Sequence, residues 1–166
     1  MKALIFSDSH GYLENIKRAI NHFNDIKVIF HLGDFIDDAK KINKAYPDLK
    51  IYAVSGNNDF TNDPSESIIN IEKHNIFMTH GHKYGVYYGI DRLYYKGLET
   101  NANIILFGHS HKKFFEKTEK CLILNPGSIS YPRDSDTPTF AIIEDKNTEI
   151  TVSFFGIEKD KIIKIF

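Results

Sequence analysis

Five short motifs in this chain carry side chains of the types that bind divalent metals. In chain order they are Asp8-Ser9-His10, Gly33-Asp34, Gly56-Asn57-Asn58-Asp59, His80-Gly81-His82 and Gly108-His109-Ser110-His111. Each supplies one or two short Asp, Asn or His side chains, and each of the first four follows an apolar, β-prone run. Because the ends of neighbouring strands gather at one edge of a sheet, we expect these side chains to meet in the folded protein.

Asp34 is the natural bridging ligand of such a site. Two metals about 3.5–4 Å apart form a recurrent centre for phosphoester cleavage, in which they hold the attacking and leaving oxygens. A carboxylate can bridge them because each of its two oxygens can face one metal, whereas a neutral imidazole cannot. The preceding Gly33 lets the backbone pass close to the cluster.

The spacing of the other motif residues suits the same centre. Asp8 and His10 lie two residues apart, and so do His109 and His111, so in an extended backbone each pair points the same way. Asn57 offers a neutral carbonyl oxygen, which limits the negative charge. Ligands of this mixed kind, without thiolate, favour Mn, Fe, Zn, Ni or Co over Ca.

The specific signal is the order of all five motifs rather than any one of them. A single Asp-x-His or Gly-Asp is common by chance, and Gly-Asn-Asn-Asp alone is more often a turn because Gly and Asn tolerate positive φ. Gly-His-x-His is moderately specific. Five motifs in this order, mostly at the ends of predicted strands, indicate a metal centre.

The first third of the chain predicts the elements that position these motifs. Strands are predicted over 3–6, 28–32 and 51–54, each ending at a motif. Between them, apolar residues recur at helical spacing over 13–23 and 39–46, and Pro47 ends the second helix. Alternating strands and helices with polar residues at the strand ends are typical of an α/β fold.

The remainder of the chain is predicted to be mostly β. A hairpin turn is expected at 73–75, a helix around 90–98, a structural turn at 125–128 and a turn at 145–147. The predicted strands are 67–71, 76–79, 103–107, 113–118, 122–124, 139–144 and 150–155. The whole pattern predicts two sheets packed together with helices outside.

Length and composition indicate one globular domain over residues 1–166. The chain is 42% hydrophobic and 26% charged, which is ordinary for a globular protein, and its net charge of -1 argues against extended nucleic-acid or membrane binding. The single cysteine, Cys121, cannot form an internal disulfide and is expected to pack inside. The short apolar opening is no signal peptide, so we expect a cytoplasmic protein.

The motif order resembles that of the calcineurin-like metallophosphoesterase superfamily, and in particular its small single-domain phosphodiesterase branch (YfcE-type). The superfamily pattern is Asp-x-His, Gly-Asp, Gly-Asn-His-Glu/Asp, His and Gly-His-x-His, and the resemblance covers residues 4 to about 133. It implies a four-layer αββα sandwich of two mixed sheets flanked by helices. It also implies hydrolysis of a small phosphoester by a hydroxide that bridges two divalent metals, most simply Mn.

The resemblance also implies which residues hold each metal. The ligands of one metal would be Asp8, His10, Asp34 and His111. The ligands of the other would be Asp34, Asn57, His80 and His109.

The third motif departs from the superfamily pattern at Asn58, where a His usually contacts the phosphate and protonates the leaving group. Asn can hydrogen-bond a phosphoryl oxygen but cannot deliver a proton at neutral pH. His82 is therefore a candidate phosphate contact or substitute acid, with an ordinary surface His as the alternative. Asp59 is a candidate for orienting a ligand, with an Asx turn as the alternative.

Arg133 is a candidate for substrate binding, because small family members carry a similar Pro-Arg after Asn-Pro-Gly-Ser and a guanidinium fork suits phosphate. A solvated loop Arg is the alternative.

His31 is expected in the core or beneath the site, and His22 and His74 at the surface. Five tyrosines after His82 could form a lid, stack on a base, make a subunit interface or pack as a helix core. They are Tyr84, Tyr87, Tyr88, Tyr94 and Tyr95.

Two other functions remain open on the sequence. A non-catalytic interaction module of the same fold, like the retromer subunit, would be expected to have lost ligands, whereas every ligand position is filled here. A nucleotide phosphatase or nuclease is disfavoured for long nucleic acids by the absence of basic runs, but a short or cyclic nucleotide fits. The chain could also form a dimer or tetramer.

Overall fold

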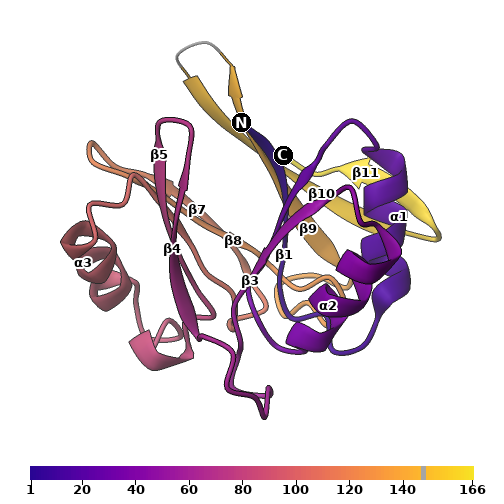
Figure 1. Cartoon of the computed structure of the whole chain (residues 1–166), viewed down its shortest axis with the longest axis horizontal. Coiled ribbons are helices and arrows are strands. Elements are labelled where there is room, and N and C mark those ends of the chain that lie inside the picture. The colour runs from indigo at the N-terminus through magenta and orange to yellow at the C-terminus, as the bar shows by residue number, and fades with distance from the viewer. Residues whose placement is uncertain (147–148) are drawn as a thin grey trace.

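The computed structural model describes residues 1–146 and 149–166. Two mixed β-sheets lie face to face at the centre, with α1 and α2 outside one sheet and α3 outside the other (Figure 1). This arrangement confirms the predicted αββα sandwich. None of the helices in the described part of the chain is long and apolar enough to cross a membrane.

The first sheet has the strand order β11-β10-β9-β1-β2-β3. Its strands are β1 (Lys2–Phe6), β2 (Val28–His31), β3 (Lys50–Ala53), β9 (Thr139–Lys146), β10 (Glu149–Glu158) and β11 (Lys161–Lys164). The strands β1, β2 and β3 are parallel, because the helices α1 (Leu13–His22) and α2 (Ile36–Ala45) return the chain between them. β9 pairs antiparallel with β1 on the other side.

The second sheet has the order β4-β5-β6-β8-β7. Its strands are β4 (Glu66–Ile71), β5 (His74–Thr79), β6 (Ile104–Leu106), β7 (Lys113–Lys117) and β8 (Leu122–Pro126). The central strands β5, β6 and β8 are parallel, and the two edge strands are antiparallel to their neighbours. A 3-10 turn (His82–Tyr84) and α3 (Asp91–Glu99) connect β5 to β6.

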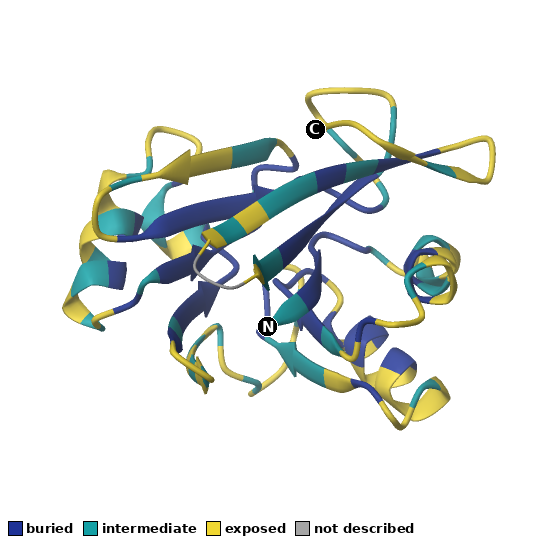
Figure 2. Ribbon diagram, turned by 90° about the horizontal axis from the view of Figure 1, so that it is seen from above, coloured by how far each residue is buried: buried dark blue, intermediate teal, exposed yellow. Residues whose placement is uncertain are grey.

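Alternation along β1 divides the core into layers. Ala3 and Ile5 face the second sheet, whereas Leu4 and Phe6 face the helices α1 and α2. On the far side, Leu93 of α3 packs against the outer face of the second sheet. Figure 2 accordingly shows buried residues along the strands between the layers and exposed residues on the outer faces of the helices.

Most predicted elements are present within a few residues of their expected bounds. The structure corrects the turns: β5 begins at His74, and β9 extends through Asp145 and Lys146, so these residues pair in a strand. The third residue of that expected turn, Asn147, lies outside the described residues. The short edge strand β11 was not predicted, because Lys-Ile-Ile-Lys shows no period-two alternation.

Candidate metal centre

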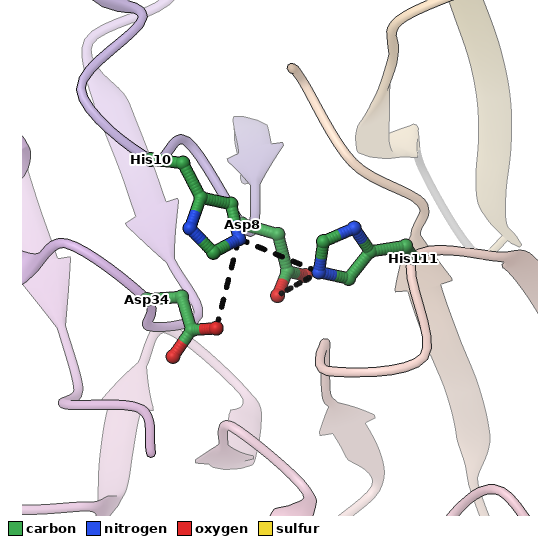
Figure 3. A group of neighbouring side chains, drawn as sticks. All are labelled: Asp8, His10, Asp34 and His111. Atoms are coloured by element: carbon green, nitrogen blue, oxygen red, sulfur yellow. Dashed lines mark hydrogen bonds and ion pairs between the residues drawn. The ribbon is translucent and has the colours of Figure 1, made fainter. Parts of the chain in front are cut away.

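Four of the predicted metal-binding side chains form one compact cluster. One ligand atom from each of Asp8, His10, Asp34 and His111 lies within 4.8 Å of those of the other three (Figure 3). Nε2 of His10 is 3.4 Å from Nε2 of His111 and 3.7 Å from Oδ2 of Asp34. These are the four residues expected around the first metal, and they come from loops that follow β1, β2 and β6.

Asp8 lies at the bottom of this cluster and is fully buried. Its Oδ2 accepts hydrogen bonds from the Ser7 hydroxyl at 2.6 Å and from the backbone N–H of His109 at 3.1 Å. Its Oδ1 lies 3.1 Å from Nε2 of His111 and accepts no hydrogen bond of good geometry from the described residues. A buried carboxylate oxygen without a hydrogen-bond partner is unfavourable unless a cation binds to it, so this oxygen points to a cation site.

Burial alone would raise the pKa of Asp8, but the close approach of Nε2 of His111 and the charges of His80 and His111 hold this pKa below its usual range. His111 responds in the opposite sense: burial would lower its pKa, but the nearby charge of the Asp8 carboxylate raises it. The two groups therefore stabilise each other's charged forms when no metal lies between them.

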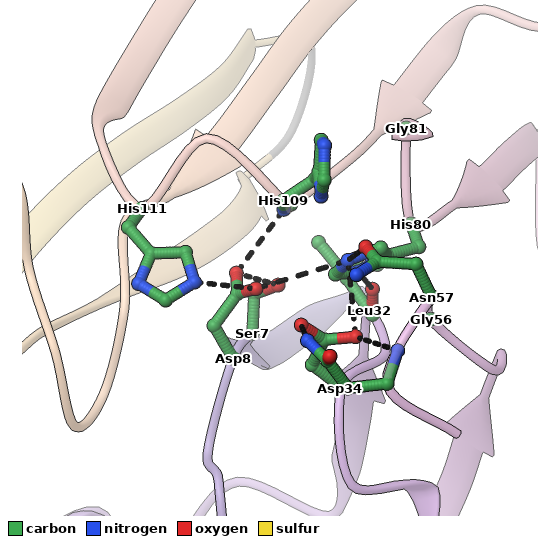
Figure 4. Close-up of polar contacts among 12 residues, drawn as sticks. Ser7, Asp8, Leu32, Asp34, Gly56, Asn57, His80, Gly81, His109 and His111 are labelled. Atoms are coloured by element: carbon green, nitrogen blue, oxygen red, sulfur yellow. Dashed lines mark hydrogen bonds and ion pairs between the residues drawn. The ribbon is translucent and has the colours of Figure 1, made fainter. Parts of the chain in front are cut away.

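A second group forms on the other side of Asp34 (Figure 4). Nε2 of His80 lies 3.3 Å from Oδ1 of Asp34, 3.2 Å from Oδ1 of Asn57 and 3.9 Å from Oδ1 of Asp8. The ring is oriented from behind, because its Nδ1 lies 2.7 Å from the backbone carbonyl of Leu32. Nε2 is thereby turned toward the carboxylate and the amide.

His111 is oriented in the same way. Its Nδ1 lies 2.6 Å from the backbone carbonyl of Tyr131, which can accept only an N–H. In both His80 and His111 the Nδ1–H therefore donates to a backbone carbonyl, and Nε2 faces the centre. Metal-binding imidazoles are usually fixed by such a hydrogen bond.

His109 joins the cluster through ring packing. Its imidazole lies edge-on to the His80 ring, with centroids 5.0 Å apart. Within the described residues, no hydrogen bond or ion pair connects this ring to Asp34 or Asn57. Burial, reinforced by the charge of His80, lowers the pKa of His109 to about 4, so this imidazole is neutral near pH 7, the form that binds metal.

The backbone that carries these residues is left-handed rather than extended. The φ angles are 55° at Asp8, 46° at His10, 55° at Asp34, 67° at His109 and 58° at His111. The expectation that each pair points the same way from an extended backbone was therefore wrong. Each residue sits in a tight turn just after its strand, and Asp, Asn and His tolerate this conformation better than most side chains.

Two motif glycines are required by close packing beneath the centre. A Cβ on Gly33 would lie 2.7 Å from Nδ1 of His80, and the φ of Gly33 is +97°. A Cβ on Gly108 would lie 1.8 Å from the hydroxyl of Ser7. The backbone thus passes so close to the cluster that no side chain fits at either position.

Asn58 and Asp59 contact the loop of Asp34. The backbone N–H of Asn58 donates to Oδ1 of Asp34 at 3.0 Å, and its side-chain amide donates to Oδ2 at 2.6 Å. Asp59 accepts the backbone N–H of Ile36 with one oxygen and that of Gly56 with the other, each at 2.8 Å. Asp59 therefore ties the second and third motifs together.

His82 lies beside the second group. Its ring centroid is 5.5 Å from that of His80 and 6.0 Å from that of His109. Burial, followed by the charges of His80 and Lys83, lowers its pKa. Its Nδ1 is buried and makes no hydrogen bond to the described residues.

Arg133 is held against the fifth motif. Its backbone N–H donates to the carbonyl of His111 at 2.9 Å, and its guanidinium donates to the hydroxyl of Tyr87 and lies over that ring, 5.7 Å from the centroid. The Tyr87 hydroxyl in turn donates to the carbonyl of His109 at 2.8 Å. Tyr87 thus links Arg133 to the loop of His109.

The sequence of this chain matches a known protein family. A profile of the calcineurin-like phosphoesterase superfamily domain matches residues 1–148. The chain belongs to the calcineurin-like phosphoesterase superfamily. Among curated members of this superfamily, it is 36% identical to the probable metallophosphoesterase YsnB of Bacillus subtilis, over 93% of this chain and 90% of YsnB. It is 25% identical to phosphodiesterase YfcE of Escherichia coli, over 87% of this chain and 88% of YfcE.

Solved structures of this calcineurin-like fold superpose over almost the whole chain. A predicted phosphoesterase of Streptococcus pneumoniae matches with a TM-score of 0.79 and 26% identity, covering 99% of this chain and 96% of the other. Vacuolar protein sorting 29 of Cryptosporidium parvum matches with a TM-score of 0.80 and 19% identity, covering 99% and 95%. The second likeness shows the fold alone.

Beneath the candidate centre lies a buried network that the motifs do not predict. The Ser9 hydroxyl donates to Oδ2 of Asp38 at 2.8 Å and lies 2.9 Å from Nε2 of His31, which donates to it in turn. The same Asp38 oxygen accepts the backbone N–H of Gly11 at 2.8 Å. The position of His31 beneath the site was expected, but nothing in the sequence pairs Asp38 with Ser9.

The tyrosines after His82 have separate roles. Tyr84 and Tyr94 pack against the core cluster around α3, whereas Tyr88 and Tyr95 are exposed. Only Tyr87 reaches the centre. Cys121 is buried and His22 exposed, as expected, but His74 is buried against Asp145 rather than at the surface.

Proposed function

We propose that this protein is a phosphodiesterase whose centre binds two divalent metals. The observation that carries the proposal is the position of the Asp34 carboxylate between two ligand groups. Its Oδ2 faces His10 at 3.7 Å, and its Oδ1 faces His80 at 3.3 Å. A carboxylate that presents one oxygen to each group is the geometry that a bridging ligand needs.

The side chains around Asp34 fit two metals. Asp8, His10 and His111 would complete the first site, and Asn57, His80 and His109 the second. The unpartnered Oδ1 of Asp8 and the two histidines fixed through Nδ1 support this assignment. Bound Mn, or Fe, Zn, Ni or Co, would activate a water molecule and offset the negative charge that develops on the phosphoryl oxygens.

The remaining candidates would act on the substrate. Asn58, exposed at the mouth of the centre, would hydrogen-bond a phosphoryl oxygen through its amide. Arg133 would bind a phosphoryl oxygen, because Tyr87 occupies only one of the five guanidinium donors. His82 would place an imidazole near the leaving oxygen, where a proton is needed.

An interaction module of the same fold is the second candidate function. The likeness to vacuolar protein sorting 29 motivates it, but that likeness rests on 19% identity. A module without catalysis would have no need to keep Asp8 ionised in a fully buried position or to orient two histidines through backbone carbonyls. The intact ligand set therefore favours the hydrolase.

The bridging role of Asp34 can be tested against a nearby acidic residue. We would prepare the metal-free protein, measure Mn stoichiometry by calorimetry, and follow hydrolysis of bis(p-nitrophenyl) phosphate. Asp34→Asn should abolish hydrolysis and reduce the Mn stoichiometry while the circular dichroism spectrum stays unchanged. Asp37→Asn is the matched control, because Asp37 is exposed on α2 and pairs only with Lys40 among the described residues. Equal activity of Asp34→Asn and the wild type would overturn the proposal.

A further inference from the structure

Three large aromatic side chains lie beside His10 and remain exposed. Phe35 is 40% exposed, Tyr12 52% and Tyr131 51%. The rings of Phe35 and Tyr131 both lie edge-on to the His10 imidazole, with centroids 5.3 and 5.8 Å away. Tyr12 packs edge-on against Tyr131 at 5.2 Å. We refer to Phe35, Tyr12 and Tyr131 as the aromatic rim.

Each ring of the aromatic rim is anchored to a loop that carries a residue of the centre. Phe35 directly follows Asp34, and Tyr12 lies two residues after His10. The backbone carbonyl of Tyr131 lies 2.6 Å from Nδ1 of His111, and this contact holds the Tyr131 backbone beside the centre. The three rings therefore keep a set position relative to the centre.

The conformation of Phe35 indicates that its position is specific. Its φ of 73° places a bulky aromatic residue in the left-handed region, where such side chains are outliers. This conformation is unfavourable for such a residue, and the ring lies against His10 rather than in the core. Strained residues of this kind cluster at ligand-binding sites.

The chemistry of the aromatic rim selects one kind of ligand. The Tyr131 hydroxyl donates to the Tyr12 hydroxyl at 2.8 Å, so of the two only the Tyr12 O–H is left to donate to a ligand. What the rim offers is aromatic surface, which binds planar rings by stacking regardless of their substituents. A flexible alkyl chain or a sugar would gain less from such a surface.

We propose that the aromatic rim binds a planar aromatic group, a nucleobase or an aryl ring, attached to the phosphoester. This inference rests on the proposed function, because the phosphate would be held at the centre while the planar group lies on the His10 side. The substrate class is then a phosphodiester with at least one aromatic substituent. The rim would contribute to substrate affinity rather than to the chemical step.

Two pairs of ligands that differ only at the planar group test this proposal on the Mn-loaded protein by calorimetry. Adenosine 5′-monophosphate and ribose 5-phosphate differ by the base, and phenyl phosphate and cyclohexyl phosphate differ by planarity. The wild type should bind the aromatic member of at least one pair about tenfold more tightly, the size of one stacking contact. The pair that shows the preference distinguishes a nucleobase from a simple aryl ring.

Variants of the aromatic rim test whether these residues cause the preference for the aromatic ligand. Tyr131→Leu and Phe35→Leu should reduce it to less than threefold while the Kd for inorganic phosphate stays unchanged. Tyr95→Leu is the control, because this tyrosine is 64% exposed, more than either rim residue, but lies on α3. A preference that is absent from the wild type, or that survives both variants, would overturn the inference. If the variants instead changed the oligomeric state with no change in preference, the rim would be a subunit contact and the inference would also fail. Failure of the proposed function would look different, since no phosphate ligand would bind with Mn.

Discussion

Asp59 accepts the backbone N–H of Ile36, the first residue of α2, across 2.8 Å with a side chain that belongs to a different loop. Its other oxygen accepts the N–H of Gly56. The side chain of Asp59 therefore joins the second and third motifs, and its orienting role stays a prediction. Because Asp34 and Asn57 lie on the two loops that it joins, its loss should disturb both metal positions.

The first prediction concerns this link. Asp59→Asn replaces one acceptor oxygen by an amide that faces a backbone N–H, so one of the two hydrogen bonds must break. Activity with Mn should fall about 10- to 100-fold if this link orients Asp34 and Asn57, the range usual for changes just outside the metal ligands. Asp63→Asn, in the same loop but on the surface salt bridge to Lys40, should leave the rate within twofold. Steady-state rates at saturating Mn check both, and equal rates for the two variants would refute the orienting role.

The second prediction concerns Tyr87. Tyr87→Phe removes the hydroxyl that holds the Arg133 guanidinium and keeps the ring over His109. If Arg133 binds a phosphoryl oxygen, KM should rise about 3- to 10-fold, the net value of one ordinary hydrogen bond, because the Tyr87 hydroxyl acts only by positioning the guanidinium. Tyr88→Phe should have no effect, because Tyr88 is 98% exposed.

A double variant separates two explanations for such a result. In an Arg133→Ala background, Tyr87→Phe should add no further loss in KM, because the residue that it positions is gone. Calorimetry should give an unchanged Mn affinity in Tyr87→Phe. A weakened Mn affinity would place the effect of the hydroxyl on the His109 loop instead, and additive losses would contradict the coupling.

The third prediction concerns the buried His31. Burial, against the opposing charges of Asp38 and Asp8, lowers the pKa of His31 to about 4, whereas an unfolded His titrates near 6.5. Between these two pKa values, His31 is protonated in the unfolded state and neutral in the folded state. The stability contributed by neutral His31 is complete above about pH 6.5 and is lost as the pH falls toward 4.

The size of this effect follows from the shift. Between pH 7.5 and 4.5, the free energy of unfolding of the metal-free wild type should fall by about 2–3 kcal/mol more than that of His31→Gln. Urea denaturation at a series of pH values in the presence of a chelator measures both proteins. The carboxylates and other histidines titrate in both, so they cancel in the comparison. Parallel pH profiles would show that His31 accepts a proton without cost.

The sequence predicts the location of the centre better than its local geometry. Apolar runs that end in polar motifs identify the strand ends, and the parallel order of β1, β2 and β3 then brings Asp8 and Asp34 to one edge. The left-handed backbone at His10 and His111 could not be predicted in this way, because hydrophobic periodicity indicates which face of an element is buried and not the backbone conformation of the turn after it.

Contacts between remote segments were also beyond the sequence. Tyr87 and Arg133 are 46 residues apart and lie in the loops after β5 and β8, which the second sheet brings to either side of β6. His74 is buried against Asp145 because the two sheets approach each other there, although a histidine beside a predicted turn suggests the surface. Pairings of this kind depend on how the layers pack, and no local pattern encodes them.

The last prediction concerns the proton for the leaving group. Asn58 occupies the position of the superfamily histidine, and its amide cannot supply a proton because it does not ionise near neutral pH. His82 carries the motif imidazole that the proposed metal sites do not use, and its ring lies 5.5 Å from that of His80. General acid catalysis contributes about 10²–10⁴-fold, and its absence affects poor leaving groups most. We therefore expect aryl diesters to react much faster than alkyl diesters, with a steep dependence of rate on the pKa of the leaving group.

Substitutions at Asn58 and His82 test whether His82 donates the proton to the leaving group. If His82 serves as a substitute acid, His82→Ala should slow alkyl esters far more than nitrophenyl esters, because a nitrophenolate departs without a proton. Asn58→His should flatten the leaving-group dependence where the new imidazole reaches the leaving oxygen. His22→Ala, at an exposed histidine on α1, is the control. A leaving-group series that is flat in the wild type and stays flat in His82→Ala would show that His82 takes no part in the reaction. Because the nitrophenyl and alkyl esters share the same metal centre, a selective loss with alkyl esters reports on proton transfer and not on metal binding.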